Sequence, residues 1–596
     1  MNYIYKKLGG IALVCTFFFI STSCEEEFLS ENPTDRLSIE ASFNTIESAE
    51  TGLIGCYSVL QGGRIFNASG YPFYWGDIGV DTFTVFFFNP DKFLHFYDYD
   101  AGDNVILDVY TEHYKAIKVV NLFLGKARQL SFETASESTE PTEENIRNFE
   151  EVKNRIVAEA SFIRAILYFN LVKVWGDVPL NLNESAIADP ADEIIPNSPQ
   201  EVVYQAIERD LLFAERWLDT DVGRALPKSQ TIATLPAVRA VLGRVYLQMT
   251  TPRTQFGIEG GIDQEGNSVS RARRFEMAAE KLALVVNEGG YSLMPNYSDI
   301  FDPSMEQSNT EMIFAVGYDG PGMDEGSSLG DTWGAFGNPP VGAFNTRDIY
   351  HEFALSYLEA DSLEFTGNNF ANDQISNFLD ELDSDKRFDL VSDSRFFQNV
   401  ARINTNFFNN ASNDVEPGAF VNNINATIFS WRPYKYKKEL TTTTPLGDQS
   451  FDYPYIRYAD VLLMLAEAYN ELGRSQDAIN LVNEVRRRAF KAEPRGEGVT
   501  IDLAPADMSR ENILRLIIRE RKWELAFEGV RKDDLIRTGL LTEIINPIEP
   551  QRNNVLEVPS TFYQTFKNHW PLPLTELNLN PNLVQNCGYP GGGACN

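Results

Sequence analysis

Histidine and several common catalytic signatures are scarce or absent in this chain of 596 residues. Its four histidines show no local metal-ligand spacing such as H-E-x-x-H, and the chain has no Walker loop and no C-x-x-C motif. These absences count against several enzyme classes together. We therefore expect no catalytic centre and no metal or other cofactor, with calcium at the segments D-Q-E-G-N or D-G-P-G-M-D-E-G as an open alternative.

Cysteine is also scarce, with five in the whole chain. Cys15 lies in the apolar N-terminal segment, and Cys56 is expected to be a small buried apolar residue. The tail C-G-Y-P-G-G-G-A-C contains Cys587 and Cys595. These two either close a small disulfide loop in an oxidising compartment or remain free thiols.

Positively charged residues are fewer than negatively charged ones: the chain has 51 basic and 85 acidic residues, and its formal net charge is -34. Such a surface repels phosphate backbones and anionic lipids, so nucleic acid is excluded as an expected partner. Polyanionic substrates are disfavoured for the same reason, while neutral ligands are compatible. Aromatic residues make up 12% of the chain, which is enough for a large core and a binding face.

The N-terminal apolar segment is too short to cross a bilayer. Lys6 and Lys7 precede an almost uncharged stretch from Leu8 to Ile20, which is shorter than the ~20 apolar residues of a membrane span. Small polar residues and Cys24 follow, and the layout resembles a bacterial lipoprotein signal. We predict a signal peptide over residues 1–23 and lipidation of Cys24, with ordinary secretion as the alternative. The three glutamates that follow would form a hydrophilic spacer.

Helical pairs dominate the mature chain. Within residues 457–489, Leu462, Leu465, Ala466 and Tyr469 form one apolar stripe, and Gly473 separates this helix from a second one. The segment matches the tetratricopeptide pattern, in which small residues such as Ala466 and Ala478 let paired helices approach closely.

Two further pairs follow the same logic. Leu242, Gly243 and Tyr246 stand as L-G-x-x-Y, and a turn-rich insertion separates them from a second helix carrying Ala278. The helix predicted over Arg155–Trp175 has a partner stripe between Tyr204 and Ala214.

We predict one mature domain over residues 24–596, mainly α with minor β. A tetratricopeptide-like helical scaffold covers about 40–290 and 455–545, and a tail covers about 546–596. Between them, about 290–455, the chain is rich in Gly, Asn, Pro, Asp and aromatic residues. Long loops of this kind tend to be functional, so this region is the expected ligand face.

Several separate segments resemble the SusD/RagB family of outer-membrane nutrient-binding lipoproteins. They are C-E-E-E-F-L-S-E-N-P-T-D, A-E-A-S-F-I-R-A-I-L-Y-F-N-L-V-K-V-W-G-D-V-P-L, Y-I-R-Y-A-D-V-L-L-M-L-A-E-A-Y-N-E-L-G, R-E-R-K-W-E-L-A-F-E-G-V-R-K-D-D-L-I-R and H-W-P-L-P-L-T-E-L-N-L-N-P-N-L-V-Q-N-C-G-Y. Cys587 replaces the usual Pro of the last motif. The resemblance implies a non-catalytic, lipid-anchored protein that faces the cell exterior and binds oligosaccharides or, in some members, peptides. It also implies a TonB-dependent outer-membrane transporter of the SusC type as partner, and a role in polysaccharide utilisation and nutrient uptake.

Aromatic residues in loops are the candidate sugar platforms, because sugar C–H faces stack on rings. Trp75 and Trp333 are the first choices, and the alternative is that each ring packs under a loop. The further candidates, three rings and three hydroxyl acceptors, are Tyr318, Phe336, Trp431, Asp77, Asp331 and Asn338.

Glu520, Glu524 and Glu528 stand at steps of four on a predicted helix. Paired carboxylates are the machinery of glycoside hydrolysis. We favour a structural salt-bridge network instead, with Arg519, Arg521, Arg531 and Lys532 as partners through i, i+3 and i, i+4 contacts. A surface glycoside hydrolase and a helical-repeat interaction scaffold that binds proteins or peptides remain the two rival functions.

Overall fold

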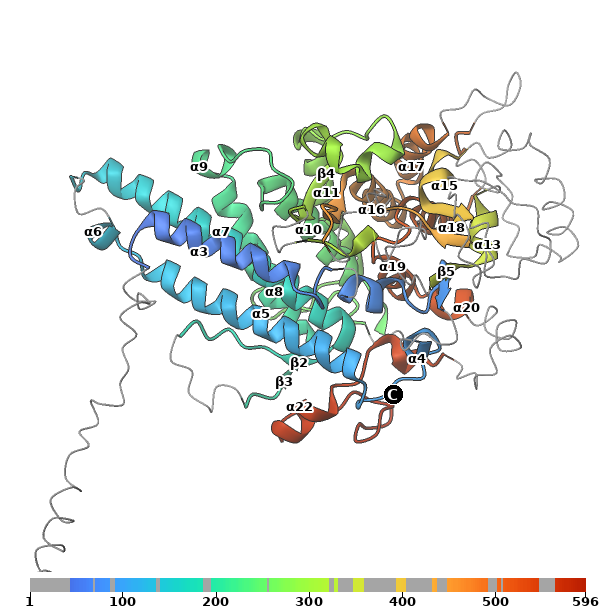
Figure 1. The fold of residues 1–596 in the computed structure, drawn as a ribbon, viewed down its shortest axis with the longest axis horizontal. Coiled ribbons are helices and arrows are strands. Elements are labelled where there is room, and N and C mark those ends of the chain that lie inside the picture. Colours follow the sequence, from blue (N-terminus) through green and yellow to red (C-terminus); the bar gives the residue numbers. More distant parts are fainter. Residues whose placement is uncertain are drawn as a thin grey trace, which may run out of the picture.

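The computed structural model describes fourteen stretches of the chain. They are residues 43–67, 70–85, 92–135, 140–185, 194–253, 257–320, 326–330, 347–357, 393–402, 431–436, 448–490, 501–504, 508–545 and 563–595. Within these stretches the protein is mainly helical, as predicted (Figure 1).

The long helices form the body of the molecule. They are α3 (Ile46–Ser58), α5 (Asn104–Gln129), α7 (Glu143–Trp175), α8 (Gln200–Leu218), α10 (Leu235–Gln248), α11 (Arg271–Glu288), α16 (Tyr458–Glu471), α17 (Ser475–Ala489), α18 (Arg510–Glu524) and α19 (Arg531–Thr538). The shorter helices and helical turns are η2 (Val59–Gln61), η3 (Pro72–Asp77), α4 (Lys92–His95), α6 (Phe132–Ala135), α9 (Asp221–Arg224), η6 (Tyr297–Phe301), η7 (Pro303–Ser308), α13 (His351–Ser356), α15 (Ser394–Asn399), α20 (Leu541–Ile545), η9 (Thr565–Asn568) and α22 (Leu574–Leu579). None of the helices in the described stretches has the length and apolar character that a bilayer crossing requires.

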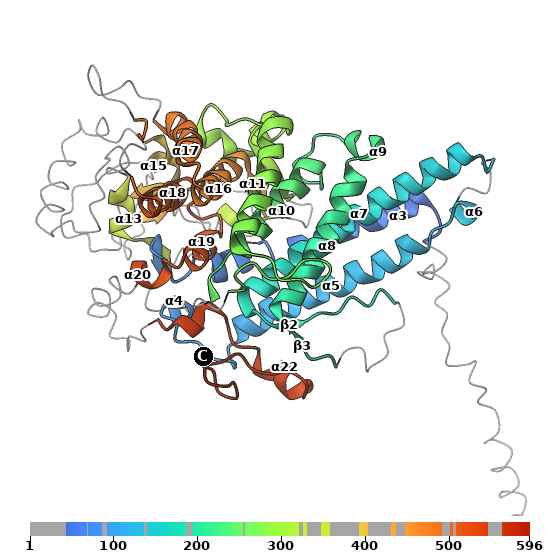
Figure 2. The same ribbon diagram turned by 180° about the vertical axis from the view of Figure 1, so that it is seen from behind.

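The three predicted helical pairs form and stack on one another. α7 packs on α8, α10 on α11 and α16 on α17, and α10 and α11 also join the first pair to the last. Both views place α10 and α11 between α8 on one side and α16 on the other (Figures 1 and 2). The stack therefore confirms a tetratricopeptide-like scaffold.

Small residues allow the close approach within these pairs. A Cβ added to Gly243 of α10 would lie 2.5 Å from Cγ of Leu282 in α11, so only glycine fits there. Ala466 and Ala478 are fully buried between α16 and α17, and Gly473 between those helices has a φ of +79°. This conformation favours glycine and turns the chain at the predicted place.

The central helix is α7, which contacts α3, α5 and α8. Nearly every residue from Arg155 onward is buried, which explains why the sequence is apolar on most of its circumference there. The helix begins at Glu143, earlier than predicted, because a polar first section is capped by Thr142, whose hydroxyl accepts from the Asn145 N–H. It ends at Gly176, whose φ is +70°.

Eight short strands form four antiparallel pairs in the described part of the chain. The strands are β1 (Phe83–Val85), β2 (Val178–Pro179), β3 (Asn197–Ser198), β4 (Met312–Val316), β5 (Arg347–Ile349), β6 (Val400–Arg402), β7 (Trp431–Pro433) and β8 (Tyr453–Arg457). The pairs are β1–β5, β2–β3, β4–β8 and β6–β7. Most of the strands come from the region predicted to be loop-rich, which supplies the minor β component.

Candidate functional site

A pocket forms where β4 and β8 pair at the edge of the loop-rich region. The two strands are antiparallel with Val316 opposite Tyr453, so the residues after β4 lie beside the residues before β8. This register brings Tyr318 to Asp452 although the two are 134 residues apart.

The helical turns η6 and η7 close the other side of this pocket, which we call the η6–η7 pocket. Its volume is about 30 Å³, which is room for about two water molecules. Its lining combines rings, amides and carboxylates. The lining residues are Gln230, Ile300, Phe301, Asp302, Pro303, Glu306, Asn309, Met312, Tyr436, Ser450, Phe451 and Asp452.

Asp452 is the central polar group of the pocket. Its carboxylate accepts hydrogen bonds from the Tyr318 backbone N–H (2.9 Å) and from Nε2 of Gln230 (2.9 Å). Burial raises the pKa of the Asp452 carboxyl to about 6, and these two donors only partly offset it. Asp452 is therefore an ionised acceptor at neutral pH.

Local sequence positions the remaining walls. Pro303 begins η7, and the side chain of Asp302 caps that turn by accepting from the backbone N–H of Ser304 (2.9 Å). The Tyr436 ring packs edge-on against both Phe301 and Phe451, at centroid distances of 5.7 and 6.1 Å. The pocket thus has a packed aromatic wall and exposed carboxylates at its rim.

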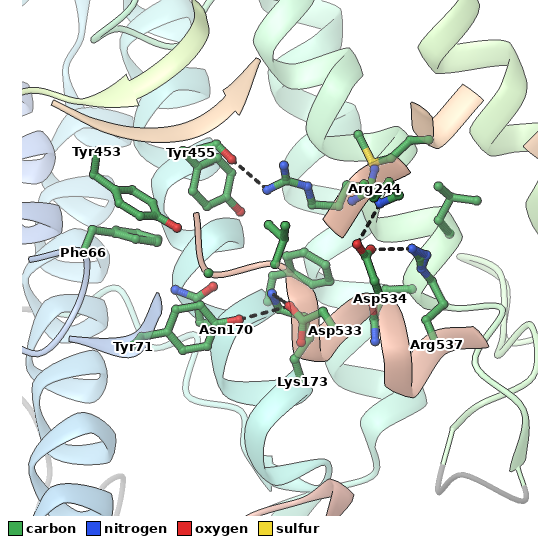
Figure 3. Close-up of a pocket in the computed structure, with 17 residues that line it drawn as sticks. Phe66, Tyr71, Asn170, Lys173, Arg244, Tyr453, Tyr455, Asp533, Asp534 and Arg537 are labelled. Atoms are coloured by element: carbon green, nitrogen blue, oxygen red, sulfur yellow. Dashed lines mark hydrogen bonds and ion pairs between the residues drawn. The ribbon is translucent and has the colours of Figure 1, made fainter. Parts of the chain in front are cut away.

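A second cavity lies inside the scaffold (Figure 3). Its volume is also about 30 Å³. Lys173 and Asp533 form an ion pair of 2.5 Å on one side, and the rings of Phe66 and Tyr453 stack at 5.2 Å on the other. Both cavities are far below the ~300 Å³ of an ordinary ligand pocket, so neither encloses a sugar ring. The ion pair beside the inner cavity joins α7 to α19.

The three glutamates of the α18 region are buried in ion pairs, as the salt-bridge hypothesis predicts. Glu524 pairs with Arg457 (2.6 Å), Arg395 (3.1 Å) and Arg488. Burial alone would raise the pKa of the Glu524 carboxyl, but these guanidinium groups hold it well below its usual range. A carboxyl held so firmly ionised is no general acid.

The predicted partners of these glutamates are wrong, however. Glu520 pairs with Arg395 and Arg486, and Glu528, which lies beyond the end of α18, pairs with Lys435 and Arg457. The basic residues that are close to these glutamates in the sequence contact other groups, because they lie on other faces of the helices. Arg521 contacts Asp460 and Asp534, Arg531 contacts Asp81, and the Lys532 ammonium lies over the rings of Trp75 and Tyr97.

The structure corrects the prediction for Trp75 and Asp77. Both belong to η3, all six residues of which are buried. The Trp75 ring is 0% exposed, and its Nε1 donates to Oδ1 of Asp533 at 2.7 Å. Asp77 accepts from the Gly529 N–H at 2.9 Å, and burial raises the pKa of its carboxyl to about 8. Neither side chain presents a surface to a sugar.

The other predicted ligand residues have different outcomes. Tyr318 is buried beside the η6–η7 pocket, where its backbone binds Asp452. Trp431 opens β7, but its side chain is not among those described. The residues that lie outside the described stretches are Cys24, Asp331, Trp333, Phe336 and Asn338, so these assignments remain predictions.

Two other sequence features are settled by the structure. Cys587 and Cys595 form a disulfide, with their Cα atoms 5.1 Å apart.

Residues 326–330 read G-S-S-L-G and fit the nucleophile pattern G-x-S-x-G, which occurs at a strand-to-helix turn. Here Ser327 forms an isolated bridge with Gln449, and the hydroxyl of the central Ser328 donates to Oδ1 of Asn67 instead of to a histidine. The described residues hold no cluster of side chains suited to a metal ion.

No motif marked the pocket residues Phe301, Tyr436 and Asp452, because they meet only through the pairing of distant strands. The one local signal is the position of Asp452, directly before a short run of strand-forming residues.

Comparison with known proteins fits this architecture. A family model described as "SusD family" matches residues 310–589, and another, described as "Starch-binding associating with outer membrane", matches residues 75–247. The chain belongs to the SusD family.

Individual SusD relatives agree over nearly the full length. SusD-like protein P25 of Formosa agariphila is 24% identical, over 98% of this chain and 100% of that protein. A SusD homolog from Bacteroides thetaiotaomicron superposes with a TM-score of 0.71 at 19% identity, covering 93% of this chain and 99% of the other. A "Laminarin binding SusD-like protein" superposes with a TM-score of 0.61 at 21% identity, covering 92% and 100%. At these identities the solved structures establish the fold alone.

Proposed function

We propose that this SusD-family chain is a non-catalytic glycan-binding lipoprotein of the outer membrane. It captures oligosaccharides at the cell surface and delivers them to a TonB-dependent transporter of the SusC type. Membership of the SusD family carries this proposal. The model that matches residues 75–247 is described as starch-binding and outer-membrane-associated, and one relative in fold is described as laminarin-binding.

The composition of the η6–η7 pocket supports a saccharide ligand. Sugar recognition needs rings for C–H faces and fixed acceptors for hydroxyls. Phe301 and Phe451 line the pocket, although each ring is only 7% exposed, and Asp452 supplies an acceptor beside them. These groups stand at the edge of the region predicted to be the ligand face, so a sugar ring lying over the pocket would meet both kinds of group.

The ion pairs of the α18 region support binding without hydrolysis. Hydrolysis needs two carboxyl groups with different protonation states facing the same glycosidic bond. Glu520 and Glu524 are at most 1% exposed and both pair with Arg395. A substrate does not reach them without unfolding this part of the core.

Calorimetric titration of residues 25–596 with soluble neutral and charged oligosaccharides, followed by product analysis, tests the proposal. We expect saturable binding to at least one glycan and no new reducing ends. Release of reducing ends would overturn the non-catalytic assignment, and silence across the whole panel would overturn the glycan assignment. The anchor is tested separately with the full chain, because Cys24→Ser should move the protein from the membrane fraction to the soluble fraction.

A further inference from the structure

The inner cavity of Figure 3 lies where helices α7, α10 and α19 meet strand β8. Its volume of about 30 Å³ is room for about two water molecules. A cavity of this size stays dry when its walls are apolar, whereas buried polar groups that lack a partner bind water. The occupant of this cavity therefore depends on the polar atoms in its walls.

Asn170 of α7 supplies an acceptor to the cavity. It is 1% exposed, and its Oδ1 has no hydrogen-bond partner in the described part of the chain. The ring of His113 fixes the direction of this amide, because its Nδ1 donates to the Val109 carbonyl (2.7 Å) and its Nε2 is left to accept from Nδ2 of Asn170 (3.3 Å). Burial lowers the pKa of His113 to about 4, so the ring is neutral near neutral pH. The Asn170 oxygen therefore faces away from His113 and needs a donor.

Tyr455 of β8 supplies a donor to the same cavity. The residue is 5% exposed, and no described residue accepts the proton of its hydroxyl. The Arg244 guanidinium lies 5.1 Å from the centroid of this ring, but a guanidinium has no acceptor atom. A molecule that donates to Asn170 and accepts from Tyr455 satisfies both groups.

The charges around the cavity favour a neutral occupant. Each cation of the described lining is paired with a carboxylate: Lys173 with Asp533, Arg244 with Asp460, Arg521 with Asp460 and Asp534, and Arg537 with Asp534 and Glu467. Four cations thus balance four carboxylates, and an added ion would leave a buried charge without a partner. A halide also lacks the donor that Asn170 needs, and an ammonium ion lacks the acceptor that Tyr455 needs. Water has both.

We propose that the inner cavity binds one or two ordered water molecules, which donate to Oδ1 of Asn170 and accept from the hydroxyl of Tyr455. These waters link the central helix α7 to β8, the strand that begins directly after Asp452. The inference does not rest on glycan binding, because the inner cavity and the η6–η7 pocket share no described lining residue.

Crystals of residues 25–596, soaked with and without bromide, test this site. We expect density for one or two waters at about 2.7–3.2 Å from Oδ1 of Asn170 and from the Tyr455 hydroxyl, with no anomalous bromide signal in the cavity. Under xenon pressure, the wild-type cavity should take up no xenon, because a hydrated polar cavity does not bind an apolar gas. Density for no water, a bromide signal or xenon in this cavity would each overturn the proposal.

Matched variants identify the groups that hold the water. Tyr455→Phe keeps the ring and should lose the water that the hydroxyl contacts. Tyr453→Phe is the control, because Tyr453 lines the same cavity from the same strand but its hydroxyl already donates to the Glu528 carbonyl (2.8 Å). Its waters should stay. Tyr455→Phe combined with Asn170→Leu makes the walls more apolar and should admit xenon.

The variants also state what would contradict this assignment. Waters that stay in Tyr455→Phe, or that are lost equally in Tyr453→Phe, would show that the Tyr455 hydroxyl does not hold them. If a variant does not fold, the water, bromide and xenon measurements on the wild type decide the proposal by themselves.

Discussion

Replacing Arg457 by methionine should destabilise the protein strongly. The Arg457 guanidinium is 0% exposed and contacts Glu311 (2.7 Å), Glu524 (2.6 Å) and Glu528 (2.8 Å). Methionine keeps much of the side-chain volume but removes the positive charge that these carboxylates contact. Removing one partner of a buried ion pair costs about 3–5 kcal/mol in unfolding free energy. We expect a loss of at least this size, because three carboxylates share this partner.

The pH dependence provides a second check on the same variant. Glu524 has a folded pKa well below its usual range, so its stabilising effect is complete above the unfolded value of about 4.3 and is lost as the pH falls through the folded value. Without Arg457, the folded pKa of this carboxyl rises and less stability remains to be lost. The difference in unfolding free energy between wild type and Arg457→Met should therefore become smaller below about pH 4.

Urea unfolding followed by circular dichroism measures both effects. Arg487→Met is the matched control, since Arg487 is largely exposed and pairs only at the surface with Asp502, where a salt bridge contributes about 0–1 kcal/mol. Equal losses in the two variants, or a loss in Arg457→Met that does not change with pH, would refute the argument that buried carboxylates cause the effect.

Two further perturbations test the packing. Gly243→Ala should lower the unfolding free energy by about 1 kcal/mol or more in urea titration, because the added Cβ would lie 2.5 Å from Cγ of Leu282. In an exposed helix the same substitution is stabilising, since alanine has the higher helix propensity. A stabilised variant would therefore contradict this contact. Cys595→Ser should destabilise the C-terminal tail by about 2–3 kcal/mol, because the disulfide closes a loop with a sequence separation of 8. Limited proteolysis should then cut the tail faster, and a reductant should make the wild type equally sensitive; unchanged cleavage would show that packing alone holds the tail.

The helical scaffold was predictable because its signals are local. The stripe of Leu462, Leu465 and Ala466 and the break at Gly473 lie within one pair of helices, and the structure places α16 and α17 there. The partners of a buried charge are not local in this way. Glu524 is paired with Arg395, Arg457 and Arg488, which come from three other segments, and no periodicity within α18 indicates them.

The aromatic site residues were misassigned for a related reason. Trp75 stands in P-F-Y-W-G-D and was predicted to be a sugar platform in a loop, yet a Cβ on Gly76 would lie 2.0 Å from the Gly529 carbonyl oxygen. That glycine marks a close backbone contact between η3 and a segment more than 400 residues later, so the neighbouring rings become core. Density of aromatic residues therefore does not distinguish a binding face from a buried turn until the distant partner is known.

The buried charges also connect the scaffold to the η6–η7 pocket. Met312 of β4 lies opposite Arg457 of β8, and the Tyr297 hydroxyl of η6 donates to the Glu524 carbonyl at 2.6 Å. Three elements that form the pocket, β4, β8 and η6, are thus fixed to the α18 region, whose ion pairs hold them in place. If this coupling is real, Arg457→Met should weaken glycan binding several-fold at a temperature where the variant is still folded, although Arg457 lines no part of the pocket. Arg487→Met should leave the affinity unchanged, and unaltered binding in Arg457→Met would mean that the pocket keeps its shape independently of the charges beneath it.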